Sequence, residues 1–251
     1  SGALVIPSSY QGKPVTAIGG SAFKDCSGLT SIEIPDAITT IGDSAFQFCN
    51  GLTSIVIPSS VTAIDIYAFA HSGLQSVTFE SPASLTSIPF AAFAGCSSLT
   101  SITIPGSVTS IDQDAFQDCS SLATVTIPNS VTSIGLQAFE ASGLTSVTIP
   151  DSVTSIGDGA FADCSSLTNI EVSSANAQYS SDDGVLFNKD KTTLVAFPGG
   201  KSGHYAIPGS VTSIGRAAFH GCRSLTTVTI PDSVTSIGTD AFYECSNLTI
   251  V

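Results

Sequence analysis

Basic residues are scarce in this sequence. Its 251 residues include only 7 Lys and Arg against 20 Asp and Glu, which gives a formal net charge of −13. Binding to nucleic acid or to an anionic membrane depends on clustered Lys and Arg side chains that attract phosphate groups. We therefore expect no nucleic-acid partner. The acidic surface mainly favours solubility, and attraction to a basic partner is the minor alternative.

Long apolar runs are also missing. No stretch of 18 or more consecutive apolar residues occurs, so we expect no membrane-spanning helix and no direct membrane insertion. No signal peptide is visible either. The repeat pattern has already begun at Leu4 and breaks off within a repeat at Val251, so we expect both ends to be cut from a longer protein.

Side chains suited to catalysis are few. The only histidines are His71, His204 and His220, and no nucleophile-elbow or zinc-protease motif accompanies them. His220 and Cys222 offer two metal ligands, whereas a structural zinc site needs four. The triplet at residues 182–184 lacks the rest of a calcium loop and predicts a tight turn. We predict no enzymatic activity, no metal and no cofactor.

The sequence does contain a regular repeat. Ala-Phe pairs recur every 22 to 24 residues, apart from one step of 58 residues. A constant period in this range is typical of a solenoid, in which each repeat forms one coil stacked on the next. We predict one elongated domain over residues 1–251 with about nine to ten repeats. The repeat phenylalanines are Phe23, Phe46, Phe69, Phe93, Phe116, Phe139, Phe161, Phe219 and Phe242.

Residues 99–121 illustrate one coil. Isoleucines that alternate with polar residues predict a half-buried strand, and a Pro-Gly pair predicts the turn that ends it. Residues 108–111 predict a second, shorter strand. Residues 112–119 predict a short helical turn that buries Phe116 and Cys119. Since one coil cannot bury its own apolar side chains, stacking should create a continuous core and parallel β-ladders.

The seven cysteines share one position of the repeat, three residues after a phenylalanine. In two repeats Ser72 and Ser142 take this position, and the loop to the next leucine is one residue shorter. Because cysteine and loop length change together, we interpret the cysteines as buried thiols that pack between coils. Disulfides between neighbouring coils are the alternative, and metal binding is a weaker one. The residues are Cys26, Cys49, Cys96, Cys119, Cys164, Cys222 and Cys245.

Two stretches depart from the period. The turn at residues 80–84 is two residues longer than its counterparts, which we interpret as neutral loop variation. The long step contains an insertion at about residues 172–206. Within it, two apolar alternating runs flank a polar turn, which predicts a β-hairpin over residues 184–197.

The pattern closely resembles the BspA-like leucine-rich repeats, also called the Treponema pallidum type. The resemblance is carried by the run LTSVTIPDSVTSIG at residues 144–157, by the Ala-Phe pair at 160–161 and by CSSL at 164–167. It covers essentially the whole chain, with small departures at Ser72, Ser142 and the long turn. The resemblance implies a right-handed, curved leucine-rich-repeat solenoid.

The resemblance also implies a surface or secreted protein of bacteria or mucosal protists. Relatives in this family adhere to host matrix proteins, to epithelium or to other microbes. We therefore expect an extracellular or cell-surface location, with a protein or glycan on another cell or in the extracellular matrix as partner. A fold does not by itself set a ligand, so the resemblance transfers no binding residues.

The outward side chains of the long strands form the candidate ligand-facing surface. They are mostly hydroxyl-bearing and nearly uncharged, although threonine also favours strands for its own sake. The surface lacks the aromatic and Arg anchors of tight interfaces, so we expect weak, multivalent contact. The candidate residues are Ser31, Glu33, Ser54, Thr78, Ser101, Thr103, Thr124, Thr126, Ser146, Thr148, Asn169, Glu171, Thr227 and Thr229.

These observations favour a non-catalytic extracellular binding or adhesion module that recognises host or microbial surface proteins or glycans. The alternative is a structural spacer or stalk within a larger surface protein. Ice binding by regular threonine columns and an enzymatic role are weaker alternatives.

Overall fold

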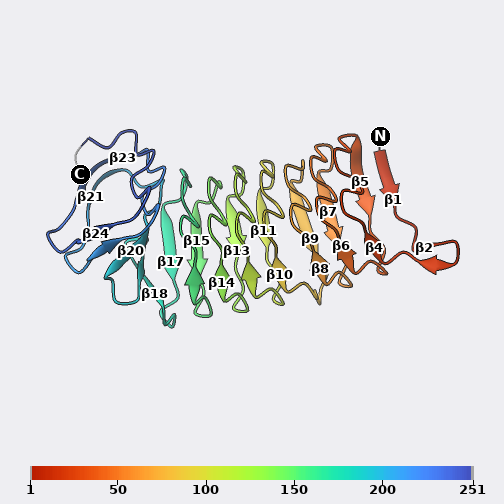
Figure 1. The fold of residues 1–251 in the computed structure, drawn as a ribbon, viewed down its shortest axis with the longest axis horizontal. Coiled ribbons are helices and arrows are strands. Elements are labelled where there is room, and N and C mark those ends of the chain that lie inside the picture. The colour runs from red at the N-terminus through yellow and green to blue at the C-terminus, as the bar shows by residue number, and fades with distance from the viewer. Residues whose placement is uncertain (1, 250–251) are drawn as a thin grey trace.

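The computed structural model describes residues 2–249, which form an elongated stack of about ten coils of about 23 residues (Figure 1). Each coil begins with a long strand, and the long strands pair in parallel as predicted. The long strands are β1 (Gly2–Val5), β5 (Leu29–Glu33), β7 (Ser54–Ile57), β9 (Ser76–Phe79), β11 (Ser101–Thr103), β13 (Thr124–Thr126), β15 (Ser146–Ile149), β17 (Asn169–Val172), β21 (Gly203–Ala206) and β23 (Leu225–Thr229).

A short strand follows in each regular coil, and equivalent residues pair, such as Ile111 with Ile134. The ladders β4-β6-β8 and β10-β12-β14-β16 run over several coils, whereas the long strands pair two at a time. An extra hairpin of β2 (Ser9–Tyr10) and β3 (Lys13–Pro14) lies in the first coil. The short strands are β4 (Ala17–Ile18), β6 (Thr40–Ile41), β8 (Ala63–Ile64), β10 (Ser87–Ile88), β12 (Ser110–Ile111), β14 (Ser133–Ile134), β16 (Ser155–Ile156), β22 (Ser213–Ile214) and β24 (Ser236–Ile237).

The repeat phenylalanines stack ring on ring through the interior. From Phe23 to Phe161 the centroids of neighbouring rings lie 5.2–5.7 Å apart, and their planes differ by 2–12°. Strands of a ladder lie only ~4.8 Å apart. The rings are therefore offset, which is the arrangement that aromatic quadrupoles prefer. Phe23 and Phe242, in the first and last coils, are only partly buried, whereas the other repeat phenylalanines are buried.

The predicted helical turn at residues 112–119 is wrong, because this segment is a series of tight turns and residues 2–249 contain no α-helix. We call the turn segment around the repeat phenylalanine of each coil, which is residues 112–119 in the Phe116 coil, the tip. Successive backbone N–H groups in the tip alternate between two kinds of acceptor. Those of Asp114, Phe116 and Asp118 donate to the next coil at 2.8–3.0 Å. Those of Ala115 and Gln117 donate to the carbonyl three residues back, at 3.3 and 3.1 Å.

An α-helix would instead direct every N–H to the carbonyl four residues back. In the tip, half of the N–H groups hold the next coil, and this needs a left-handed backbone at two points. Asp114 and Asp118 have φ values of 56° and 57°. Asp tolerates this region better than most residues because its short polar side chain can bond locally. The helix-like spacing of Phe116 and Cys119 arises equally from turns three residues long.

The cysteine thiols bond to the Phe carbonyl of the preceding coil. Cys119 Sγ lies 3.1 Å from the carbonyl oxygen of Phe93, and five further cysteines make the equivalent contact. Cys49, Cys96, Cys119, Cys164 and Cys222 are buried. Cys245 is half-buried and Cys26 is exposed, since they lie on the last and first coils.

The insertion is an expanded coil that begins with β17. Between its long and short strands it adds β18 (Tyr179–Asp182), which pairs antiparallel with β19 (Val185–Asn188). β19 pairs antiparallel with β20 (Thr193–Ala196), at the place where the sequence predicts a hairpin. β20 then continues the short-strand ladder into β22 and β24. The last residues of the predicted insertion form β21, a regular long strand, so the additional length lies before Gly203.

This expanded coil has a Phe position but no full tip. The N–H of Phe197 donates to the carbonyl of Ala218 at 2.7 Å, which is the contact that a repeat phenylalanine makes with the next coil. Beyond it, the N–H of Asp163 donates directly to the carbonyl of His220 at 3.0 Å. The tips of two coils that are far apart in sequence therefore lie side by side.

β19 also divides the hydrophobic core. Leu186 packs in the core formed by the coils before it, while Val185 and Phe187 pack in a second core with the coils after it. Side chains alternate between the two faces of a strand, so one strand serves both cores. In the residues described, the ring column runs unbroken as far as Phe161 and resumes at Phe197.

Replacement of Phe116 by Ala should lower the free energy of unfolding by roughly 3–5 kcal/mol, because the ring is fully buried between two others. Urea denaturation followed by circular dichroism measures the loss. Val56→Ala, at a side chain that is 48% exposed, is the control and should change stability by less than about 0.5 kcal/mol. A loss below about 1 kcal/mol for Phe116→Ala would contradict a close-packed ring column.

A thiol reagent at pH 8 should modify Cys26 readily in the native protein and leave the five buried cysteines unmodified. Burial raises the pKa of the thiols of Cys96 and Cys164 to about 11. The thiolate is the reactive form, and at pH 8 only about one such thiol in a thousand is ionised. Mass spectrometry of labelled peptides reads the result. Labelling in guanidinium chloride, where all seven should react, is the control.

Candidate functional site

The outward side chains of the long strands, here the long-strand face, include all fourteen predicted residues. Thirteen of them are exposed and Thr227 is half-buried. Their backbones pair in register where strands are joined, as Ser101 does with Thr124 and Ser146 with Asn169. The structure therefore sets the predicted residues in rows along one side of the stack.

Four positions at the two ends of this face were missed from the sequence. Ala3 and Val5 pair with Ser31 and Glu33 at one end, and His204 and Ala206 pair with Thr227 and Thr229 at the other. β1 precedes the first Ala-Phe pair, and β21 lies inside the stretch that was assigned to the insertion. The hairpin strands β18 and β19 separate β17 from β21, so the rows are interrupted between Glu171 and His204.

Hydroxyl groups elsewhere on the surface are used inside the stack. Seven threonines, one before each of seven short strands, donate through Oγ1 to the backbone oxygen of the matching threonine one coil earlier. The distances are 3.1–3.3 Å, and the residues are Thr39, Thr62, Thr109, Thr132, Thr154, Thr212 and Thr235. On the long-strand face, no candidate side chain within residues 2–249 has such a partner in the chain. Its hydroxyls are therefore available to a ligand.

Two hollows border the long-strand face. One, of about 250 Å³, lies over β13 and β15 and is lined by their Thr and Ser side chains. The other, of about 580 Å³, lies where β5 and β7 end, and Glu33, Asp36, Val56 and Glu80 contribute to its wall. Glu80 belongs to the long turn at residues 80–84. The second hollow is acidic and partly apolar.

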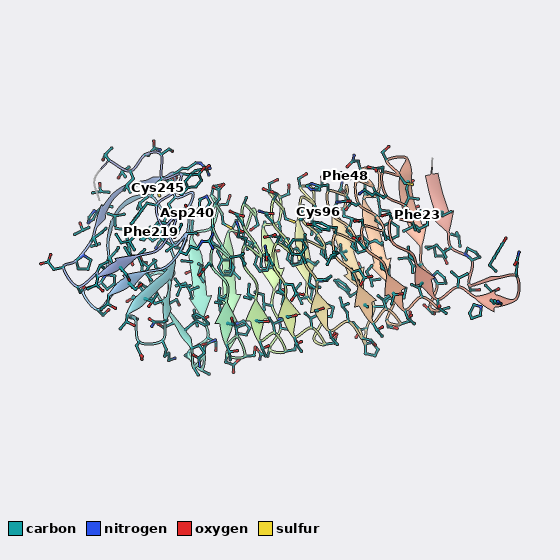
Figure 2. The ribbon with its side chains drawn as sticks, in the orientation of Figure 1. Phe23, Phe48, Cys96, Phe219, Asp240 and Cys245 are labelled. Carbon is teal, nitrogen blue, oxygen red and sulfur yellow. The ribbon has the colours of Figure 1, made fainter. Side chains whose placement is uncertain are left out.

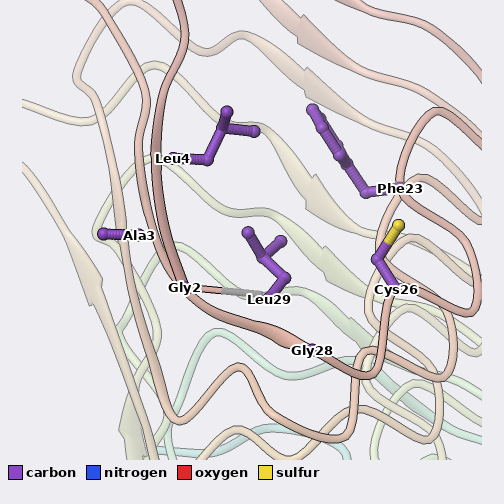
Figure 3. Close-up of a pocket in the computed structure, with 7 residues that line it drawn as sticks. All are labelled: Gly2, Ala3, Leu4, Phe23, Cys26, Gly28 and Leu29. Carbon is purple, nitrogen blue, oxygen red and sulfur yellow. The ribbon is translucent and has the colours of Figure 1, made fainter.

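A third hollow, of about 390 Å³, opens on the first coil (Figure 3). Figure 3 shows the side chains of Leu4, Phe23, Cys26 and Leu29 pointing into it. These are positions that the following coils bury in the core. Apart from the Cys26 thiol, the side chains that line it carry no titratable group, so the hollow offers mainly packing surface.

One cluster of titratable residues is partly enclosed. Glu140 is 9% exposed, and its Oε2 accepts hydrogen bonds from Gln117 Nε2 at 2.7 Å and from Gln137 Nε2 at 2.6 Å. His220 Nδ1 lies 3.9 Å from Glu140 Oε1, because the missing tip brings their coils close. Burial raises the pKa of the Glu140 carboxyl, although Gln117, His220 and Gln137 partly oppose this shift.

The hollow beside Glu140 has a volume of about 70 Å³. Small-molecule sites usually measure ≈ 300–1,000 Å³, so this hollow is smaller than a usual small-molecule site. Three residues after His220, Arg223 forms ion pairs with Asp163 and Glu244 and so links three coils. These charged groups hold coils together around the expanded coil.

The other histidines do not join this cluster. His71 stacks on Phe48 with the ring centroids 5.0 Å apart, and His204 lies on β21. Over residues 2–249, no group of three or more His, Cys, Asp or Glu side chains is placed to hold a metal ion. In the same range, no helix is long and apolar enough to span a membrane.

Asp183 and Gly184, at φ 47° and 75°, form the tight turn between β18 and β19.

The family model for the BspA type leucine rich repeat region matches this chain at residues 16–141, 86–200 and 195–251. The chain belongs to that family. No curated protein sequence matches the chain.

Solved structures of other leucine-rich repeat proteins share the fold. A leucine rich cell surface protein from Faecalibacterium prausnitzii is 36% identical with a TM-score of 0.83, and the match covers 99% of this chain and 68% of that one. The pneumococcal vaccine antigen PcpA is 28% identical with a TM-score of 0.79, covering 99% and 60%. A leucine-rich repeat protein from Eubacterium ventriosum is 28% identical with a TM-score of 0.62, covering 97% and 57%.

Glu140→Gln should make stability less dependent on pH. The pKa of Glu140 is raised in the folded protein. Protonation of Glu140 therefore stabilises the folded protein relative to the unfolded one. This stabilisation is present at low pH and is lost as the pH rises through the folded pKa. The Gln variant lacks this loss. Urea midpoints between pH 4 and pH 7 measure it, with exposed Glu171→Gln as control. Parallel curves for wild type and Glu140→Gln would contradict the buried carboxyl.

Proposed function

We propose that this chain is a non-catalytic binding module at a cell surface, and that the long-strand face contacts a protein or glycan of another cell or of the extracellular matrix. Two similar proteins of known structure, a cell surface protein and a vaccine antigen, support the location. The small size of the hollow beside Glu140 argues against catalysis there.

One observation carries the proposal. The hydroxyls of the threonine column donate to backbone oxygens, as Thr109 does to Thr86, whereas those of the long-strand face, such as Thr103 and Thr126, have no partner among residues 2–249. The coil spacing sets these free hydroxyls ~4.8 Å apart. Each bond to a ligand contributes little, about 0.5–1.5 kcal/mol, so affinity depends on many of them acting together.

Screening of a glycan array and a panel of matrix proteins tests the proposal, with the domain displayed as a tetramer so that weak contacts add. Saturable binding of at least one ligand class is the expected result. No binding at high micromolar concentration would argue against a binding module.

Thr103→Arg combined with Thr126→Arg should weaken the binding found in that screen by about fivefold or more. Two bulky charges would displace the ligand and its hydrogen bonds on the long-strand face. Ser98→Arg with Ser121→Arg adds the same charge at exposed loop positions and should leave affinity within about twofold. Equal losses in both variants would place the contact elsewhere.

A spacer role is the second candidate. Each of the three solved relatives extends beyond the matched region, which covers 68%, 60% and 57% of their lengths. A rigid stack between other parts of a surface protein would use the same fold. Binding that survives deletion of residues 29–248 from a longer protein would favour the spacer.

A further inference from the structure

The tip positions vary more between coils than the positions that build the core. In the three coils around Phe46, Phe69 and Phe93, large apolar side chains take these outward places. Phe48 is 38% exposed and Ile66 is 43% exposed. Figure 2 shows Phe48 at the outer edge of the stack. The repeat itself does not require apolar groups here, since the equivalent residues in the Phe116 coil are Gln113 and Asp118.

We call the aromatic and apolar side chains on the tips of these three neighbouring coils the tip patch, which consists of Phe48, Ile66, Tyr67, His71 and Phe90. The rings of Phe48 and His71 stack with centroids 5.0 Å apart and planes 7° apart. The rings of Tyr67 and Phe90 meet edge to face at 5.1 Å.

Small residues beneath the patch fix its rings. Ala70, Ala91 and Ala94 form a minor core that is separate from the main one, and Tyr67 and Phe90 pack against it. A Cβ atom at Gly95 would overlap the His71 ring, so the absence of a side chain there lets the imidazole lie flat. The patch is therefore held in place before any partner arrives.

Carboxylates border the tip patch. Asp65 directly precedes Ile66, and the Asp25 N–H donates to the Gln47 carbonyl beside Phe48. Asp43 precedes Ser44, whose N–H donates to the Ile66 carbonyl at 3.0 Å. Asp43 and Asp65 thus lie on coils that carry patch residues, and Asp25 lies on the coil directly before them.

The chain itself supplies almost no positive charge to these carboxylates. No Lys or Arg occurs between Lys24 and Lys189. Within residues 2–249, every ion pair joins side chains between positions 140 and 244. Lys24, on the preceding coil, forms none of them. The patch combines two exposed rings, Phe48 and His71, and two half-buried rings, Tyr67 and Phe90, with carboxylates that form no ion pair within residues 2–249. Its electrostatic complement is a cation.

We propose that the tip patch docks a segment of a partner protein that carries arginine or lysine side chains. An Arg or Lys head can lie over an aromatic ring and be held by a carboxylate at the rim, while its apolar stem covers Ile66. Aromatic anchors are also the groups that dominate protein–protein binding energy. This surface is separate from the long-strand face, so the proposal does not rest on the function proposed above.

The probe is a fluorescent twelve-residue peptide of alternating arginine and serine with one tyrosine, titrated by fluorescence anisotropy at 50 and 300 mM salt. The matched peptide replaces every arginine by glutamine. The arginine peptide should bind, more weakly at high salt, and the glutamine peptide should not. Equal binding of the two peptides, or a patch that binds only neutral glycans on an array, would overturn the proposal.

Paired variants separate the patch from the general negative charge of the protein. Asp43→Asn with Asp65→Asn should weaken peptide binding by about fivefold or more, whereas Asp151→Asn with Asp232→Asn, which removes the same charge elsewhere, should weaken it less than twofold. Equal losses in the two pairs would mean non-specific attraction and would overturn the proposal.

Phe48→Ala and Ile66→Ser should each weaken binding by about fivefold or more, while Tyr243→Ala, at a 56% exposed ring on the last coil, should have no effect. Thermal melts confirm that each variant folds. Since Ile66 is exposed, its variant remains informative if Phe48→Ala is unstable. Unchanged affinity in Ile66→Ser would overturn the proposal.

Discussion

Backbone hydrogen bonds from each coil to the next are the constraint on which this structure depends. In the tip, every second N–H is directed to the neighbouring coil, and the strands add their own ladders. These bonds keep successive coils in the same register. Equivalent side chains of successive coils therefore contact each other, and phenylalanine packs on phenylalanine. A residue that suits one coil suits the others for the same reason, which explains the near-identical columns of the sequence.

Much of this arrangement could be predicted from the sequence, because the core positions repeat. The alternation of Ile102 and Ile104 predicted a strand, and the common spacing of the Ala-Phe pairs predicted the stack and its continuous core. The tip could not be predicted in the same way. Phe116 and Cys119 are spaced as in a helix, but turns of three residues with left-handed Asp114 and Asp118 bury the same side chains. Spacing alone does not distinguish these two backbones.

The expanded coil and the long-strand face contain features that the sequence did not predict, for a different reason. β18 has the polar sequence YSSD, which lacks alternation, and it is a strand only because β19 lies beside it. His204 and Ala206 were missed on the long-strand face because their strand follows an irregular stretch. The contact between Glu140 and His220 depends on the absence of a tip in the expanded coil, and no local sequence pattern predicts that absence. A feature that depends on contacts with neighbouring coils cannot be predicted from the sequence of a single repeat.

The division of the core at β19 has a consequence for how such a chain can change its length. Regular coils present the same columns on both sides, so loss or duplication of one whole coil before β17 brings matching surfaces together again. The expanded coil meets the coils before it through Leu186 and those after it through Val185 and Phe187. It cannot be exchanged for a regular coil without remaking both contacts. Unequal recombination should therefore shorten or lengthen the regular segment and leave the expanded coil in place.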